Sequence, residues 1–304
     1  MLSLEDKIKR IDKVFGIDKV KSKKVDTEAI KRYYRINRFA YKIFHSWEGF
    51  VHMGISRDGV FKKEDLYEQP KFVEKYLKDL DGGKVLELAA GKGASLKFLS
   101  KRNPKINFYG LDLPNGQLGV AERNLKKLKN VKLVEGDYHD LSCFDDSTFD
   151  VVYIFEGLCY SNRKDLVSKE VIRVLKKGGH FIVVDGYSSE KIENLKNIHR
   201  ICHDLASKGM MLDQYYYYND VRDEIISQGF KVVFEEDLSQ FIIPTGERFE
   251  KLSSMAIFDK PFIGKFLVKI FYTDFSYNAI FGYLMPDLMR EGVGKYMVTV
   301  FQKI

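Results

Sequence analysis

The stretch from Lys84 to Ser95, KVLELAAGKGAS, constrains the fold of this chain more than any other segment. An apolar run contains the acid Glu87 and leads into a Gly-x-Gly turn at Gly91 and Gly93. Glycines at such a turn permit a tight reversal and a close approach of the backbone to a ligand. The stretch therefore predicts the first strand and turn of a sheet that binds a nucleotide-type cofactor.

Short apolar runs alternate with helical patterns from residue 84 to about residue 185. This alternation is typical of a doubly wound α/β sheet with parallel strands. We expect strands at Lys84–Leu88, Asn107–Leu111, Val131–Glu135, Asp150–Phe155 and His180–Val184. We expect intervening helices that include Gln117–Leu128 and Leu166–Leu175.

The regions on either side of this pattern predict two additions to the sheet. Residues 1–80 carry apolar side chains at helical spacing, and a cluster at residues 81–83, Asp-Gly-Gly, ends them. We therefore expect a helical N-terminal lid at 1–80 and the main domain at 81–304. Two more strands are expected at Lys231–Phe234 and Met297–Phe301, with an aromatic insertion at about 242–292 between them. Insertions of this length usually serve binding, so we expect a cap over the substrate; a dimer surface, a membrane-contacting face and ordinary core remain alternatives.

Composition excludes several classes of partner and site. The net charge is +7, but acids are interspersed among the lysines, so we expect no nucleic-acid partner. Cys143, Cys159 and Cys202 form no CxxC pair, which predicts no disulfide and no structural zinc. His199 and His203 lie four residues apart without a supporting acid, so a solvated helix face is favoured over a metal site. The N-terminus lacks the apolar core of a signal peptide, and we expect a cytoplasmic protein.

Three acids follow three successive strands and favour one kind of cofactor. Glu87 would repel a pyrophosphate but neutralise an ammonium group. Asp112 can accept both hydroxyls of a ribose, and Asp137 can accept a hydrogen bond from an exocyclic amine while Tyr138 flanks the purine. A dinucleotide fingerprint would have glycine where Leu96 stands. S-adenosylmethionine is therefore favoured over a nicotinamide cofactor.

In these motifs the chain resembles the class I S-adenosylmethionine-dependent methyltransferases, through KVLELAAGKG, GLDLPNGQ, EGDYHD, FDVVYIFEGLCY and VIRVLKKGGHFIVVD. The resemblance implies a Rossmann-like, doubly wound sheet of seven strands, mostly parallel with an antiparallel last strand. The family has glycine where Ala89 stands in this chain. The cofactor residues implied by the resemblance are Tyr34, His52, Glu87, Ala89, Gly91, Gly93, Asp112, Leu113, Gln117, Asp137, Tyr138, Phe155 and Glu156.

A narrower resemblance lies outside the sheet. The segments WEGFVHMG (47–54), DLSQFIIP (237–244) and AIFGYLMPDLMREGVGKYMVTVFQK (279–303) are similar to segments of the sterol and tocopherol C-methyltransferases. This likeness implies methyl transfer to a small, apolar or amphipathic acceptor by in-line displacement at the sulfonium. Separately, the aromatic insertion is a candidate for peripheral membrane contact, and the Cys and His spacing predicts no metal. The likeness does not define the acceptor, the methylated atom or the oligomeric state.

Catalytic candidates and competing functions complete the expectations. Only an acceptor that must lose a proton needs a base, and His52, Tyr160 and Glu156 are the candidates. The main alternative is an N- or O-methyltransferase acting on a phosphobase or another small amine or hydroxyl acceptor. A nicotinamide oxidoreductase would share the sheet. A non-catalytic cofactor-binding subunit is a further alternative, because Ala89 and Tyr160 depart from the common pattern.

Overall fold

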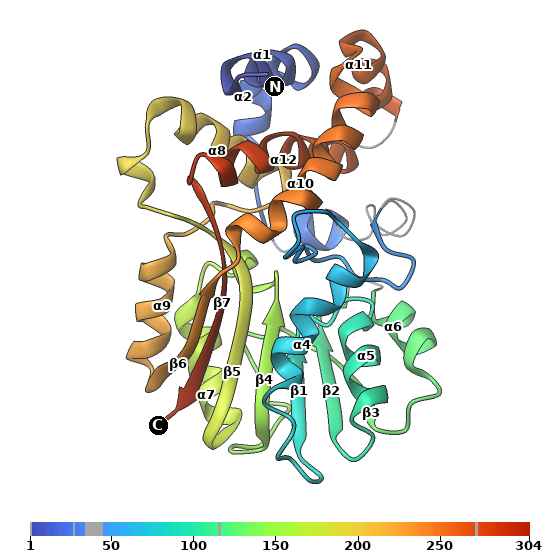
Figure 1. Ribbon diagram of the computed structural model, residues 1–304, viewed down its shortest axis with the longest axis vertical. Helices are drawn as coiled ribbons and strands as arrows, with labels where there is room; N and C mark the ends of the chain where they lie inside the picture. Colours follow the sequence, from blue (N-terminus) through green and yellow to red (C-terminus); the bar gives the residue numbers. More distant parts are fainter. Residues whose placement is uncertain (1, 27, 34–44, 115–116, 271–272) are drawn as a thin grey trace.

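The computed structural model describes residues 2–26, 28–33, 45–114, 117–270 and 273–304. Seven strands form one sheet in the order β3-β2-β1-β4-β5-β7-β6 (Figure 1). The strands are β1 Lys84–Leu88, β2 Asn107–Asp112, β3 Val131–Glu135, β4 Phe149–Phe155, β5 Leu175–Ser188, β6 Phe230–Asp237 and β7 Gly294–Lys303. Only β7 runs antiparallel to its neighbours, β5 and β6. The predicted class I methyltransferase fold is therefore confirmed.

The strands agree closely with the expected positions, and the main difference is in β5. This strand begins at Leu175 rather than at His180, and its ladder with β4 shifts register between Phe149 and Val151. Gly179 lies inside the irregular part, where an added Cβ would come within 2.9 Å of the Lys176 carbonyl oxygen. The glycine allows two backbone segments to approach closely and lets β5 continue through a bulge that an apolar pattern alone does not reveal.

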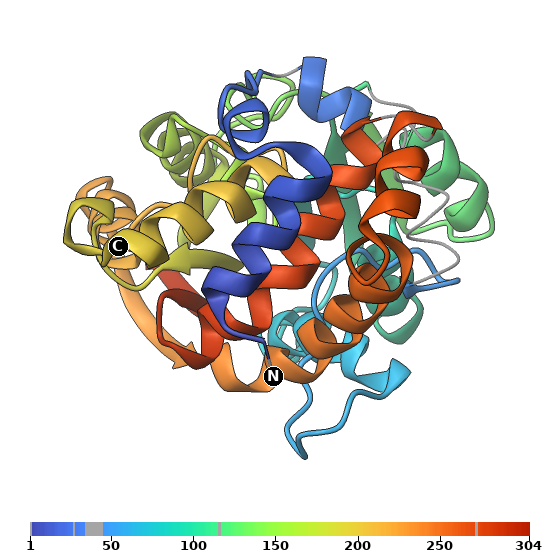
Figure 2. The same cartoon turned by 90° about the horizontal axis from the view of Figure 1, so that it is seen from above.

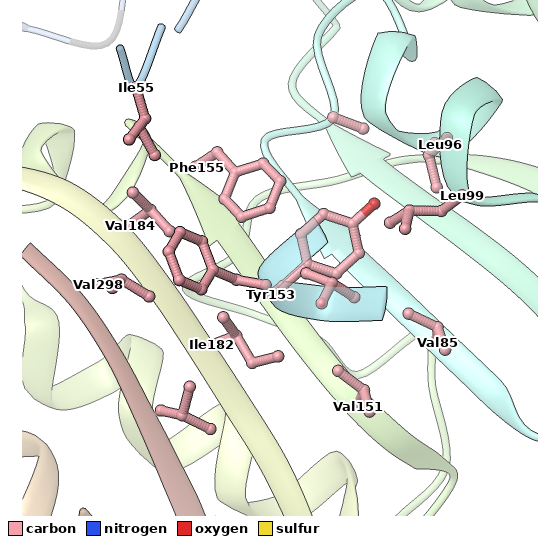
Figure 3. Packing of buried hydrophobic residues seen from close by; sticks show 14 of the residues in the cluster. Ile55, Val85, Leu96, Leu99, Val151, Tyr153, Phe155, Ile182, Val184 and Val298 are labelled. Carbon is pink, nitrogen blue, oxygen red and sulfur yellow. The ribbon is translucent and has the colours of Figure 1, made fainter. Parts of the chain in front are cut away.

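Helices cover both faces of the sheet through two apolar clusters. One face packs against α4 Glu68–Glu74, α5 Ala94–Arg102 and α6 Leu118–Leu125. The other packs against α7 Lys164–Val174 and α9 Tyr218–Ser227. Figure 3 shows the first cluster, in which Val85, Tyr153 and Ile182 from three neighbouring strands lie side by side. Continuous apolar strands buried on both faces are what a parallel sheet requires.

The insertion after β6 is helical and lies above the carboxyl ends of the parallel strands (Figure 1). It consists of α10 Ser239–Ser253, a π-helical turn Ser254–Phe258, α11 Pro261–Ile270 and α12 Thr273–Arg290. α8 Asn197–Gly209 joins it, and α10 and α12 are in extensive contact. We call α8 and α10 to α12 together the cap.

The described residues before β1 pack both on the cap and beside the sheet. α1 Leu4–Phe15 and α2 Ile17–Lys21 lie on the outer surface of the cap, and Figure 2 shows α1 crossing α12. There Lys7 is buried and forms ion pairs with Glu250 (2.5 Å) and Asp287 (2.6 Å). Residues 50–77 instead contribute Met53 and Phe72 to the core beside the sheet. None of the described helices combines the length and apolar character needed to cross a bilayer.

Candidate active site

A cavity of about 790 Å³, here called the cofactor cavity, opens where β1, β2 and β4 end at their carboxyl ends. Ligands of open α/β sheets bind at this edge. The structure brings nine of the predicted cofactor residues together around it, namely Ala89, Gly91, Asp112, Leu113, Gln117, Asp137, Tyr138, Phe155 and Glu156. Tyr160 also lines it, whereas Tyr34 falls outside the described residues.

In the turn after β1, every second residue has a positive φ angle. Ala89, Gly91 and Gly93 have φ angles of 54°, 55° and 72°. The Gly91 N–H donates a hydrogen bond of 2.6 Å to the Asp112 carboxylate, which ties the turn to the end of β2. Gly93 does not line the cavity; an added Cβ there would lie 2.7 Å from Leu125. Gly93 therefore allows α6 to pack against the turn, a role different from the predicted cofactor contact.

Alanine at position 89 has an identifiable neighbour. A left-handed conformation is unfavourable for any residue with a Cβ, so Ala89 occupies a position that favours glycine. Its methyl group faces Gly157, where an added Cβ would approach it to 2.9 Å. The small residue after Glu156 thus makes room for the methyl group that position 89 carries.

Glu87 is buried and does not line the cofactor cavity. Burial raises the pKa of its carboxyl group well above the usual range, and the neighbouring Asp112 adds to this shift. Its Oε2 atom has no hydrogen-bond partner within the described part of the chain. A buried, unpartnered carboxyl oxygen would be stabilised by a cation, so the site fits an ammonium-bearing cofactor; direct contact with Glu87 stays a prediction.

The residues after β2 and β3 form a polar wall. Asp112 is buried at the end of β2. Asp137 accepts hydrogen bonds from the backbone N–H and the Nδ1 of His139, at 2.9 and 2.6 Å. Tyr138 donates to the Gly157 carbonyl oxygen (3.1 Å), and burial raises the pKa of Tyr138. His139 lines the cavity and was missed from the sequence, although it belongs to the motif EGDYHD.

Leu96, at the position of the third dinucleotide glycine, is fully buried against β2. An added Cβ at Gly110 would lie 2.5 Å from a Leu96 methyl carbon. The glycine that allows α5 to approach the sheet is therefore Gly110 on β2 rather than a residue of α5. This geometry accounts for the missing third glycine.

A second cavity of about 840 Å³, here called the acceptor cavity, lies between the sheet and the cap. Val51, Glu156 and Tyr160 line both cavities, so the two adjoin. The remaining lining is mainly apolar and aromatic and comes from distant parts of the chain, including Met53, Tyr187, Ala206, Met210, Tyr215, Ile242, Phe281, Met285, Leu288, Met289, Val293 and Tyr296. The predicted cap insertion thus supplies much of this wall.

Glu156 lies at the junction and is held firmly. Its φ angle is 47°, an uncommon conformation for a non-glycine residue and one that clusters at functional sites. Its Oε1 accepts hydrogen bonds from the Met53 N–H (2.6 Å), from the Tyr296 hydroxyl and from the Gln69 amide (3.4 Å). Burial raises the pKa of Glu156 to about 7. A carboxyl group with such a pKa can accept a proton near neutral pH.

Asp185 and His203 line the acceptor cavity and were not predicted for it. Asp185 accepts hydrogen bonds from the backbone N–H groups of Cys159 (2.9 Å) and Gly186 (2.8 Å), and burial raises its pKa. The signal available in the sequence was the acid that ends the apolar run HFIVVD, which forms part of β5. The prediction of a solvated face at His203 is wrong, because His203 is buried and donates from Nε2 to the Tyr215 carbonyl oxygen (3.2 Å).

His52 is placed differently from the predicted catalytic role. It lines neither cavity; its Nε2 donates to the Leu66 carbonyl oxygen (2.8 Å) and its ring packs between Phe50 and Phe155. Burial lowers the pKa of His52 to about 4. The ring therefore supports the wall of the site and is not positioned as a base. Tyr160, in contrast, lines both cavities and donates to the Met210 carbonyl oxygen (3.1 Å).

Comparison with known proteins agrees with this site. Residues 86–183 match the model of a family described as a methyltransferase domain. A sterol 24-C-methyltransferase of Kluyveromyces lactis is 28% identical over 158 residues, which cover 51% of this chain and 42% of that protein. The chain thus spans less than half the length of this curated relative.

Two solved structures share the fold at low sequence identity. A cyclopropane synthase from Mycobacterium tuberculosis has a TM-score of 0.75 at 12% identity, covering 92% of this chain and 99% of that one. A geranyl diphosphate C-methyltransferase from Streptomyces coelicolor, solved with Mg²⁺, a substrate analogue and S-adenosyl-L-homocysteine, has a TM-score of 0.68 at 14% identity, covering 91% and 97%.

The sheet topology of this chain is that of the class I S-adenosylmethionine-dependent methyltransferases, and residues 86–183 match a methyltransferase domain. Within that class, its sequence is similar to that of the sterol C-methyltransferases.

Proposed function

We propose that this chain transfers a methyl group from S-adenosylmethionine to a small apolar or amphipathic acceptor. The observation that carries the proposal is the junction of two cavities at Glu156, Tyr160 and Val51. One cavity is walled by the polar ends of the strands, and the other by the mainly apolar cap. Such a junction is the place where a methyl donor and an apolar acceptor would meet.

The residues of this chain would act mainly by positioning. S-adenosylmethionine, when bound, supplies a methyl group on a positively charged sulfur, which is already activated for displacement. Asp112, Asp137 and Tyr138 would hold and orient the nucleoside, while the aromatic walls exclude water. If the acceptor must lose a proton, Glu156 can take it, because its pKa of about 7 is close to the working pH.

Binding and turnover test the proposal separately. Calorimetry should detect S-adenosylhomocysteine binding to the full chain, and labelled S-adenosylmethionine should methylate a member of a panel of apolar alcohols, quinols, phenols and sterols. Binding without transfer to any panel member would instead support the cofactor-binding subunit. Binding of NADH in place of S-adenosylhomocysteine would support the oxidoreductase alternative.

We also propose that α11 contacts an anionic membrane surface. Phe262 and Phe266 lie one turn apart on its outer face and are 88% and 61% exposed. Lys265 and Lys269 are exposed on the same helix, which carries no acid within Pro261–Ile270. Exposed aromatic residues combined with lysines are typical of helices that bind at the headgroup region of anionic bilayers. An apolar acceptor dissolved in the bilayer would then lie near the cap.

Vesicle sedimentation tests the membrane contact. The double variant Phe262→Ala and Phe266→Ala should lose binding to phosphatidylserine-containing vesicles, while Val60→Ala, an equally exposed apolar residue elsewhere, should bind as the wild type does. Equal binding of wild type and double variant would remove α11 as the contact. Self-association of the wild type that the double variant loses would instead identify a dimer surface. The cytoplasmic location stays a prediction.

A further inference from the structure

The charged side chains that line the acceptor cavity, among the described residues, are acids. Glu156 and Asp185 are the acids of its lining, and no lysine or arginine belongs to the described residues that line it. His203 is neutral in this setting, because burial lowers its pKa. The nearby Lys164 does not line the cavity; its Nζ donates to the Ser161 carbonyl oxygen (2.6 Å) and lies 3.6 Å from the centre of the Tyr216 ring.

The polar atoms of the cavity are mostly acceptors of hydrogen bonds. Oε1 of Glu156 already accepts three, whereas Oε2 has no hydrogen bond within the described part of the chain. Asp185 accepts the backbone N–H groups of Cys159 and Gly186 and also faces the Cys159 thiol, so its two oxygens, with about four lone pairs, retain at least one acceptor site. The hydroxyl groups of Tyr160 and Tyr296 donate to protein atoms instead. A ligand that donates would therefore find partners here.

Among the described residues that line the cavity, a ligand that carries an anion would find no counter-charge and few free donors. Moving a phosphate or carboxylate beside the buried Asp185 and the half-buried Glu156 costs desolvation and repulsion together. The geranyl diphosphate enzyme shares this fold and was solved with a diphosphate analogue and Mg²⁺, so the fold alone does not set this preference. The side chains that line the cavity set it.

We propose that the acceptor is an apolar molecule that presents a hydroxyl or amine group to Glu156 and Asp185 and that carries no phosphate or carboxylate. This inference rests on the proposed function and selects among its acceptors. It disfavours phosphobases and retains apolar alcohols, phenols and amines. Glu156, which reaches both cavities, is then the residue that directs the polar end of the acceptor toward the cofactor cavity.

Three probes of equal chain length test the inference without requiring turnover. Dodecanol, dodecylamine and dodecyl phosphate are titrated below their aggregation concentrations into the chain saturated with S-adenosylhomocysteine. The alcohol and the amine should bind at least about tenfold more tightly than the phosphate, a difference of about 1.4 kcal/mol. Phosphate binding equal to that of the alcohol would overturn the inference, as would binding of none of the three.

Glu156→Gln is the matched variant, because a glutamine can keep its oxygen toward the three donors and place its NH₂ group in the cavity. It should weaken amine binding about tenfold, whereas Glu122→Gln on the exposed face of α6 should not. Unchanged amine binding in a Glu156→Gln protein with normal thermal unfolding would remove Glu156 as the anchor. If the chain fails to bind S-adenosylhomocysteine, the proposed function fails, yet the ranking of the probes with the unliganded chain still decides the inference.

A second measurement needs no variant. The affinity of the wild type for dodecylamine should rise between pH 6 and pH 8 as Glu156 ionises, with its pKa near 7, while that for dodecanol should change less. A flat amine profile would contradict the anchoring role. The other titratable or charged groups near Glu156 are Asp185, Cys159, His203, Tyr296 and Lys164.

Discussion

The two cavities of this chain are constructed in different ways. The cofactor cavity is assembled from turns that directly follow consecutive strands, within residues 89–160 apart from Ile30 and Val51. The acceptor cavity takes its walls from segments that range from Val51 to Tyr296, and helices α8, α10 and α12 of the cap supply part of them. The first is therefore set by sheet topology, whereas the second is set by packing among distant helices. A substitution in one cavity should consequently weaken ligand binding there and leave binding in the other cavity unchanged.

The largest expected effect is on stability at the junction. Glu156 has a folded-state pKa of about 7 against an ordinary value of 4.5, so the folded state holds its proton more tightly than the unfolded chain does. The contribution of Glu156 to the free energy of unfolding is therefore fully present below pH 4.5. It is lost as the pH rises to about 7, a change of about 3 kcal/mol. The unfolding free energy of wild type minus that of Glu156→Gln, from urea titrations, should fall over this range. A pH-independent difference would show that the junction carboxyl is not buried.

The next effect should be confined to the cofactor cavity. Asp112→Ala removes the carboxylate that holds the Gly91 N–H at the end of β2. We expect about a 30-fold loss of S-adenosylhomocysteine affinity with dodecanol binding retained, measured by calorimetry. Glu122→Ala is the exposed control. If Asp112→Ala weakens both ligands equally, the two cavities are not separate units.

The reciprocal variant is Phe281→Ala in the cap. Phe281 lines the acceptor cavity and stacks near Tyr215, with ring centroids 6.4 Å apart. Its loss should weaken dodecanol binding about tenfold and lower the unfolding free energy by about 2 kcal/mol, while S-adenosylhomocysteine affinity stays within about twofold of the wild type. A variant that loses cofactor affinity instead would contradict the division.

The smallest effect concerns the turn after β1. Ala89→Gly removes the backbone strain of an alanine in the left-handed conformation. It should raise the unfolding free energy by about 0.5 kcal/mol, a value that already includes the opposing effect of the greater freedom of glycine in the unfolded chain. Ala94→Gly at the start of α5 is the control and should lower it by about 1 kcal/mol. Destabilisation by both variants would show that the contact of Ala89 with Gly157 outweighs the backbone strain.

The same division explains how much the sequence could predict. The strand positions and the sheet class could be predicted from the alternation of apolar runs and helical patterns. Nine residues of the cofactor cavity could be predicted because each lies at a fixed distance along the chain from the end of an apolar run. Gly93 was predicted to contact the cofactor, and Leu96 was taken as a departure from the dinucleotide fingerprint. The packing roles of these two residues depend on Leu125 and Gly110, which only the folded structure reveals. His52 was misassigned for the same reason, since its environment comes from Leu66 and two aromatic rings.

The residues of the acceptor cavity were the hardest to foresee. Asp185 ends the motif VIRVLKKGGHFIVVD, but nothing in that motif shows that a cap closes over it, and His203 belongs to a helix that the sequence predicts to be solvated on that side. Their positions result from the folding of the cap over the carboxyl ends of the strands (Figure 1). No local pattern contains that arrangement.

A crystal structure of the chain with S-adenosylhomocysteine bound tests the central claim most directly. The account predicts the nucleoside between Asp112 and Asp137, with the sulfur at the junction formed by Glu156 and Tyr160 and with the acceptor cavity still open beside it. A ligand that instead occupies the acceptor cavity, or whose sulfur points away from Glu156, would contradict it.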